Sequence, residues 1–400
     1  MGILNKIFSS AYFYGILLAI TSFLLALFTY LLTGTGLWWG VTGAESQMGG
    51  VFWTLFGLHI SSLQYYHVYP IPEFNRAFTW FLVYGVILGP LLVSSFRKEF
   101  SIRQVPNKWL SIEALSGGTL IGYGTRMAGG CNIGDFYSGF ATGSAWAFPF
   151  FLAMIAGIYS IIISKRFMGH RGISISKLTP TMIWPEKNVQ ISIFVASIAL
   201  ISVMLAFVDN LVRLWLVFGL IFGSVGYLGT LCFQTSFRET IERSSGRKMA
   251  RVLAISLLVF SIVSQIAILG FGMKANFFFD QSESVLYQTL GGYIFGLGMG
   301  LAFNCTFSME WRMGSGNIQA LITFIGLTFI GAPLYAITYS WWHSFIPVVV
   351  SPSHYWQFSL YKFGISGAML IDLFPIIWFI YSLKPVVSYR QKALKIKERY

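Results

Sequence analysis

Charged residues are scarce in this chain of 400 residues. They make up 10% of the sequence while hydrophobic residues reach 56%, whereas soluble globular domains carry roughly a quarter charged residues. This composition excludes an ordinary soluble globular protein and indicates a membrane protein. Apolar runs of about 20 residues recur along the whole chain, and each is long enough to cross a bilayer.

Acidic residues and histidines are also few, with 14 Asp and Glu and five His. The histidines have no metal-ligand spacing and the acidic residues form no cluster, so we expect no metal site and no cofactor. A phosphate-binding loop is missing too, because the glycine-rich run from Gly118 to Gly124 has no strand before it and no lysine at its end.

The excess positive charge, +13, lies in the short loops between apolar runs rather than on one polar surface. This placement is the positive-inside signature, so we expect a lipid bilayer and no nucleic acid as partner. One side of the bilayer receives 21 of the 27 basic residues: Lys6, Arg97, Lys98, Arg103, Lys108, Lys165, Arg166, Arg171, Lys177, Lys187, Arg238, Arg243, Arg247, Lys248, Arg251, Lys384, Arg390, Lys392, Lys395, Lys397 and Arg399. Both termini are then cytoplasmic, and residues 384–400 form a basic cytoplasmic tail.

We expect an all-α, polytopic protein with one transmembrane domain over residues 1–400 and about ten spanning helices. The expected spans are 12–33, 78–96, 110–128, 145–163, 190–208, 212–232, 252–273, 286–304, 318–340 and 360–383. The first is too long for the apolar core of a signal peptide, so we expect it to be retained. A stretch near 51–63 is too short to span and is a candidate for a re-entrant half-helix.

Cysteine occurs only three times, and an odd number argues against a disulfide framework. Two cysteines end similar runs at an offset of 174 residues: Gly117, Gly118, Gly122, Gly124 and Ala128 precede Cys131, and Gly291, Gly292, Gly296, Gly298 and Ala302 precede Cys305. The first run is expected to point outward and the second inward, which indicates inverted repeats. We place the repeat halves approximately at 50–188 and 189–383. A helix break at each Gly/Cys junction would bring both thiols near the membrane midplane.

Cys131 is the strongest candidate for a binding residue. A lone buried cysteine is most often a small hydrophobe, but Gly129, Gly130 and Gly134 surround this one and let a ligand approach the backbone. Arg126 lies five residues earlier, at expected membrane depth, where a charge is costly and usually functional. It either attracts an anion or pairs with Asp135.

The other two cysteines have less distinctive surroundings. Cys305 is followed by Glu310 and Arg312, which form either a structural ion pair at a helix end or part of a substrate path. Cys232 follows glycines at 219, 223 and 226, a spacing typical of small-residue helix packing. Gly85 and Gly89 in the first half echo that spacing in parallel orientation and without a cysteine.

At these residues the chain resembles the YeeE/YedE family of prokaryotic sulfur-transport membrane proteins. The likeness rests on the run that ends Ala128-Gly129-Gly130-Cys131-Asn132-Ile133-Gly134, on Cys232 to Glu239 and on Cys305 to Arg312. The segments 34–43 and 56–59 are similar to the longer YedE branch, so the resemblance covers nearly the full length. Departures are Phe303-Asn304 where the family has two glycines, Ser308 where it has glycine, and Thr230-Leu231 before Cys232.

The resemblance implies an importer in the prokaryotic inner membrane for sulfur-containing anions such as thiosulfate, and not an enzyme. It implies that Cys131, Cys232 and Cys305 line the path, and that a TusA-like sulfur-carrier protein is the cytoplasmic partner. The nearest alternative is transport of selenium compounds by the same path. A membrane-embedded enzyme that handles persulfide and a protein with a scaffold role are the other two alternatives.

Overall fold

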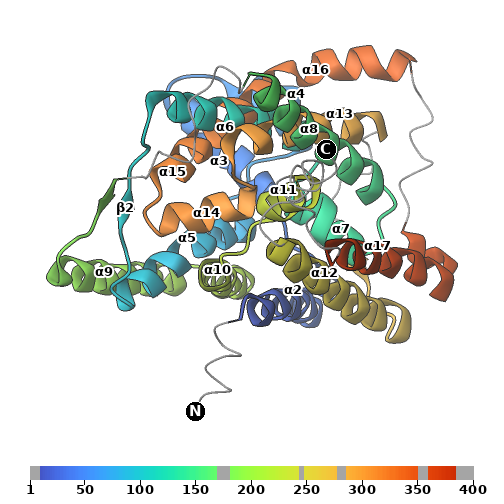
Figure 1. Cartoon of the computed structure of the whole chain (residues 1–400), viewed down its shortest axis with the longest axis horizontal. Helices are drawn as coiled ribbons and strands as arrows, with labels where there is room; N and C mark the ends of the chain where they lie inside the picture. Colours follow the sequence, from blue (N-terminus) through green and yellow to red (C-terminus); the bar gives the residue numbers. More distant parts are fainter. Residues whose placement is uncertain (1–9, 169–180, 243–246, 277–284, 350–358, 384–400) are drawn as a thin grey trace, which may run out of the picture.

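The computed structural model describes residues 10–168, 181–242, 247–276, 285–349 and 359–383, which are almost entirely helical (Figure 1). The α-helices are α2 (Ala11–Thr33), α3 (Thr42–Leu55), α4 (Gln64–Val68), α5 (Phe78–Phe96), α6 (Lys108–Ala128), α7 (Gly139–Ala141), α8 (Ala147–Met168), α9 (Lys187–Ala206), α10 (Asn210–Gly229), α11 (Phe233–Glu242), α12 (Lys248–Gln265), α13 (Val285–Ala302), α14 (Thr306–Gly314), α15 (Ile318–Ile325), α16 (Ala332–Val349) and α17 (Ile365–Leu383).

Short turns of 3₁₀ and π-helix complete these elements. They are η1 (Ile60–Ser62), η2 (Phe74–Arg76), η3 (Asn132–Ser138), η6 (Ile266–Gly270), η7 (Gly326–Gly331) and η8 (Leu360–Phe363). Two pairs of two-residue strands tie loops together: β1 (Gly36–Leu37) runs parallel to β4 (Ala275–Asn276), and β2 (Ile102–Arg103) runs antiparallel to β3 (Met182–Ile183).

The prediction of an all-α, polytopic membrane protein is confirmed. Within the described residues, nine helical stretches are long and apolar enough to cross a membrane. The remaining predicted span, 110–128, lies in α6, which has 21 residues but carries Lys108, Glu113 and Arg126. The predicted span 78–96 coincides with α5. The predicted tail, 384–400, lies outside the described residues.

The short stretch near 51–63 belongs to a longer helical unit than the sequence predicts. The helix α3 begins at Thr42 and has 14 residues, and η1 and α4 follow it. At 1.5 Å per residue, a helix of this length extends about 21 Å, less than the ~30 Å of a hydrocarbon core. It is therefore too short to span.

The two glycine-rich helices of the sequence repeat, α6 and α13, pack directly against each other in antiparallel orientation. A Cβ atom on Gly124 would lie 2.7 Å from the carbonyl oxygen of Gly291, and a Cβ on Gly291 would lie 2.7 Å from that of Gly124. Gly117 and Gly298, at the matching positions of the repeat, make the same reciprocal contact. Only glycine permits two backbones to approach this closely, and the reciprocity is what an inverted repeat requires.

On the faces that point away from each other, α6 and α13 also pack on further helices through glycines. Gly292 and Gly296 of α13 pack on the backbone of α8, and Gly118 and Gly122 of α6 pack on that of α15 and η7. A second pair, α5 and α10, runs parallel and is joined at Gly85 and Gly219. These glycine contacts fix the backbone around the cysteines. The boundaries of the repeat halves, 50–188 and 189–383, stay a prediction.

Candidate functional site

The three cysteines occupy the same position in three copies of one local structure. Each lies two residues after a residue in the left-handed conformation, with φ of 88° at Gly129, 50° at Thr230 and 55° at Phe303. These residues follow the last residue of α6, α10 and α13. The breaks expected before Cys131 and Cys305 are present, and a third, which the sequence does not predict, precedes Cys232.

A short helical segment begins directly after each cysteine, and its first turn is largely buried. These segments are η3 and α7 after Cys131, α11 after Cys232, and α14 after Cys305. Each sulfur accepts a backbone N–H from the first turn: Ile133 N lies 3.4 Å from Cys131 Sγ, Thr235 N 3.5 Å from Cys232 Sγ, and Ser308 N 3.3 Å from Cys305 Sγ. The thiols therefore stand where serine or asparagine usually caps a helix N-terminus, the positive end of its dipole.

A cavity of about 170 Å³ lies beside the first thiol. We call it the Cys131 cavity, and its lining includes Arg126, Gly129, Gly130, Cys131 and Gly134. Five of the seven predicted site residues thus lie together. A molecule of liquid water occupies about 30 Å³, so the cavity has room for a small inorganic anion.

Arg126 supplies positive charge to this cavity. Its side chain is 6% exposed, and its Nη2 donates a hydrogen bond to Thr42 Oγ1 at 2.6 Å. The guanidinium charge acts on the carboxyl groups of Glu45 and Asp135, but Arg126 forms no salt bridge within 4 Å among the described residues. The alternative of a simple ion pair with Asp135 is therefore not what the described side chains show.

Gly130 makes room for Asp135 next to the cavity. A Cβ atom at position 130 would lie 2.5 Å from Asp135 Oδ1 and 2.9 Å from Oδ2. Any other residue would displace the carboxyl group, which is fully buried. The glycines around Cys131 thus set the position of a charged neighbour as well as the path of the backbone.

The other two thiols meet at one hydroxyl group. Cys232 Sγ and Cys305 Sγ each donate to Ser308 Oγ at 3.2 Å. The same oxygen accepts the backbone N–H of Cys305 at 3.0 Å, which completes a reciprocal cap of α14. Ser308, a departure from the family pattern, is a site residue that sequence reasoning did not select. We call this group the thiol pair.

Glu310 and Arg312 point to different partners and do not form an ion pair. Arg312 Nη1 donates to Asn304 Oδ1 at 2.8 Å and to the carbonyl oxygen of Phe303 at 3.2 Å, which fixes the turn before Cys305. The carboxyl group of Glu310 instead faces that of Glu45 on α3. Sequence reasoning missed Glu45, although an acidic residue among apolar residues is a recognised signal of function.

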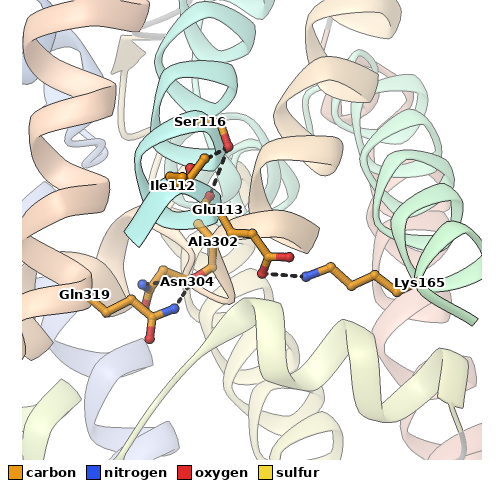
Figure 2. Close-up of polar contacts among 7 residues, drawn as sticks. All are labelled: Ile112, Glu113, Ser116, Lys165, Ala302, Asn304 and Gln319. Carbon is orange, nitrogen blue, oxygen red and sulfur yellow. Dashed lines mark hydrogen bonds and ion pairs between the residues drawn. The ribbon is translucent and has the colours of Figure 1, made fainter. Parts of the chain in front are cut away.

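The turn after α13 is held by further polar contacts, shown in Figure 2. Gln319 Nε2 and Asn304 Nδ2 each donate to the carbonyl oxygen of Ala302 at 3.2 Å. Nearby, Lys165 Nζ lies 2.9 Å from Glu113 Oε2. The ring of Phe303 lies against two cations, with Lys165 Nζ 4.3 Å and the Arg238 guanidinium 5.3 Å from its centroid. An aromatic ring and a group of basic residues therefore surround this turn.

Comparison with known proteins finds one matching family and two relatives that cover most of the chain. The sequence model of a family described as sulphur transport matches residues 3–160 and 228–399, and these segments contain all three cysteines. The chain is 24% identical over 344 residues to the probable transporter YedE of Salmonella typhimurium, covering 81% of this chain and 80% of that protein. It is 24% identical over 366 residues to the probable transporter YedE of Escherichia coli, covering 86% and 85%.

A third relative is similar over a shorter region. The thiosulfate transporter TsuA of Spirochaeta thermophila is 28% identical over 143 residues, which is 34% of this chain and 40% of that protein. This match covers only part of both proteins.

Proposed function

Because the chain belongs to the sulphur transport family, we propose that it imports small sulfur-containing anions such as thiosulfate along a path lined by Cys131, Cys232 and Cys305. The observation that carries this proposal is the common placement of the three thiols, each buried at the N-terminal end of a short helical segment. A helix N-terminus attracts negative charge, and a thiol is a weak donor with a soft sulfur. The name of the partial relative, a thiosulfate transporter, supports the choice of substrate.

The first station of the path is the Cys131 cavity. The anion enters from the side opposite the basic loops and is attracted by Arg126. Asn132 follows Cys131, and its side-chain nitrogen, Nδ2, is buried. This nitrogen has no hydrogen-bond acceptor among the described residues, so it is available to an anion. The Cys131 thiol then contacts the terminal sulfur of the anion without holding it by a fixed charge. Weak binding suits transport, because a site must release what it binds.

The second station is the thiol pair. Asn132 Oδ1 accepts a hydrogen bond from Thr306 Oγ1 at 3.0 Å, so the residues that follow Cys131 and Cys305 are in direct contact. The charge of Arg312 acts on the Cys232 thiol and favours an anion there. When the anion arrives, the two thiols turn their S–H groups from Ser308 Oγ to its sulfur atom. The anion passes from the first station to this one without crossing bulk solvent.

The inner end lies at Phe303, Lys165 and Arg238. The bias of basic residues places this end at the cytoplasm, with both termini on the same side. A carrier protein of the TusA type would receive the sulfur compound there, because the positive charge of Arg238 draws the anion toward the exit, while Lys165 is paired with Glu113. With both termini cytoplasmic, the proposed location is the inner membrane of a prokaryotic cell.

The test is uptake of labelled thiosulfate into proteoliposomes by the wild type, Cys131→Ala and Cys131→Ser. Selenite is measured in parallel. We expect uptake of thiosulfate to be lost in Cys131→Ala while the protein still elutes as a single species from size exclusion. Full uptake by Cys131→Ala would overturn the thiol path. Uptake of selenite alone would assign the path to selenium compounds, and a covalent persulfide on a cysteine, seen by mass spectrometry, would support the enzyme instead.

A further inference from the structure

A group of acidic side chains lies next to the Cys131 cavity and has no part in the path described above. Glu45 of α3, Glu310 of α14 and Asp135 of η3 are each 0% exposed. The carboxyl groups of Glu45 and Glu310 face each other at hydrogen-bonding range. The guanidinium of Arg126 acts on both Glu45 and Asp135, so elements from distant parts of the sequence bring the three carboxyl groups around Arg126 and Cys131.

No donor among the described residues satisfies these carboxyl groups. Within the described part of the chain, none of the six carboxyl oxygens accepts a hydrogen bond from an N–H or O–H group. A buried carboxylate without donors costs several kcal/mol, and two ionised carboxylates in contact repel each other, so that one retains its proton. A hydrogen bond between Glu45 and Glu310 can form only if one of them is protonated.

The charges around Glu45 and Glu310 do not remove the need for a proton on one of the two carboxyl groups. Arg126 is the cation that acts on Glu45 and on Asp135. The Cys131 thiol faces Glu310, and Tyr65, which faces Arg126, exchanges a hydrogen bond with Ser46 at 3.0 Å. One guanidinium against three carboxylates would leave a net charge of −2 beside a cavity proposed to receive an anion. An anion binds there only if protons lower that charge.

We propose that Glu45 and Glu310 together bind one proton, and that occupancy of this site is coupled to occupancy of the Cys131 cavity by the anion. The coupling rests on the proposed function, because the anion in question is the one that the protein is proposed to transport. Protonation lowers the negative charge that the anion meets, and by linkage the bound anion raises the affinity of the pair for its proton.

The chemistry of the step is a proton transfer alone. A proton from water that reaches the cavity adds to a carboxylate oxygen of Glu45 or Glu310 and forms one O–H bond. The same O–H bond breaks when the anion leaves and the proton returns to water. No electrons are transferred, so no redox partner is needed. Entry of the anion is thereby accompanied by entry of a proton into the protein.

The proton site is tested first without any anion, by infrared spectroscopy of the purified protein at neutral pH. The wild type is expected to show the C=O stretch of a buried, protonated carboxylic acid. Glu45→Gln and Glu310→Gln should each lose that intensity, because the new amide N–H donates to the remaining carboxylate and replaces the shared proton. The exposed Glu73→Gln serves as the matched control and should leave the band unchanged. A band that neither pair variant alters would overturn the shared proton.

The coupling is tested by the pH dependence of thiosulfate uptake into proteoliposomes. In the wild type, uptake at limiting concentration should rise as pH falls, by at most about tenfold per pH unit for one linked proton. Either Gln variant carries the charge of the singly protonated pair at every pH, so its uptake should lose this dependence. The same pH profile in wild type and variants would overturn the coupling. Absence of wild-type uptake at any pH, with the infrared band as expected, would leave the proton site standing and remove both the thiosulfate assignment and its coupling.

Discussion

Asn132 and Thr306 hydrogen-bond to each other through Oδ1 and Oγ1 at 3.0 Å, and they are the same position of the two repeats, 174 residues apart. Equivalent residues of two inverted copies meet only where the symmetry axis passes between them. Each residue follows the cysteine of its own copy. The contact therefore marks the centre of the repeat and joins the Cys131 cavity to the thiol pair, which is where a site shared by inverted repeats is expected.

The first prediction concerns this central contact. Thr306→Val keeps the shape of the side chain but removes the donor, which leaves a buried Asn132 oxygen unsatisfied. We expect a loss of about 1–3 kcal/mol in stability, measured as a lower melting temperature in detergent. In a double-mutant cycle with Asn132→Ala, the two effects should not add, since both remove one bond. Additive effects would show that the contact contributes nothing of its own.

The second prediction concerns the glycine contact between α6 and α13. In Gly124→Ala, the new Cβ would lie 2.4 Å from the backbone nitrogen of Phe295, and two helix backbones cannot yield as a flexible side chain does. We expect a destabilisation of about 1–3 kcal/mol or more. Gly270→Ala is the control, because nothing lies within 4 Å of a Cβ at that position, and it should stay within ~0.5 kcal/mol of the wild type. Equal melting temperatures for the two variants would contradict this account.

The membrane-spanning helices and the residues that line the Cys131 cavity next to Cys131 could be predicted, because both depend on short stretches of sequence. Hydropathy along 78–96 is enough to define α5, and the glycines that surround Cys131 are its direct neighbours in the chain. The offset between the two glycine runs indicated two similar copies. Their opposite directions followed from the distribution of basic residues over the loops.

What the sequence did not predict depends on contacts between distant elements. Glu45 and Glu310 are 265 positions apart, and neither is conspicuous until α3 and α14 meet. In the sequence, Ser308 is only a departure from the family pattern, and its contact with Cys232 is visible only in the structure. Thr230 is a β-branched residue and gave no signal of a left-handed turn, which glycine usually signals. The third helix break could be recognised only in the structure.

The third prediction separates backbone strain from side-chain contacts at Phe303. This residue has φ of 55°, a conformation that costs a residue with a Cβ about 1–2 kcal/mol relative to the right-handed region. Phe303→Ala and Phe303→Gly both lose the ring that contacts Lys165 and Arg238, but only the alanine retains the strain. We expect the glycine variant to be more stable than the alanine variant by about 1 kcal/mol. Equal stability of the two in a denaturation series would show that the turn relaxes when the ring is lost.

The fourth prediction tests the thiol pair through its shared hydroxyl group. Ser308→Ala removes the acceptor of both thiols and of the Cys305 N–H, so the two sulfurs lose their common position. We expect thiosulfate uptake to fall at least as far as in Cys232→Ala, together with a stability loss of about 1–3 kcal/mol.

The control for that experiment is Ser315→Ala, a buried serine that donates to the carbonyl oxygen of Arg312 at 2.9 Å. It lies at the other end of α14 and touches neither thiol in the described structure. If uptake falls equally in the two serine variants, the loss comes from a weakened α14. If it falls only in Ser308→Ala, with equal melting temperatures, the loss comes from the contacts of Ser308 with the two thiols and not from a weakened α14.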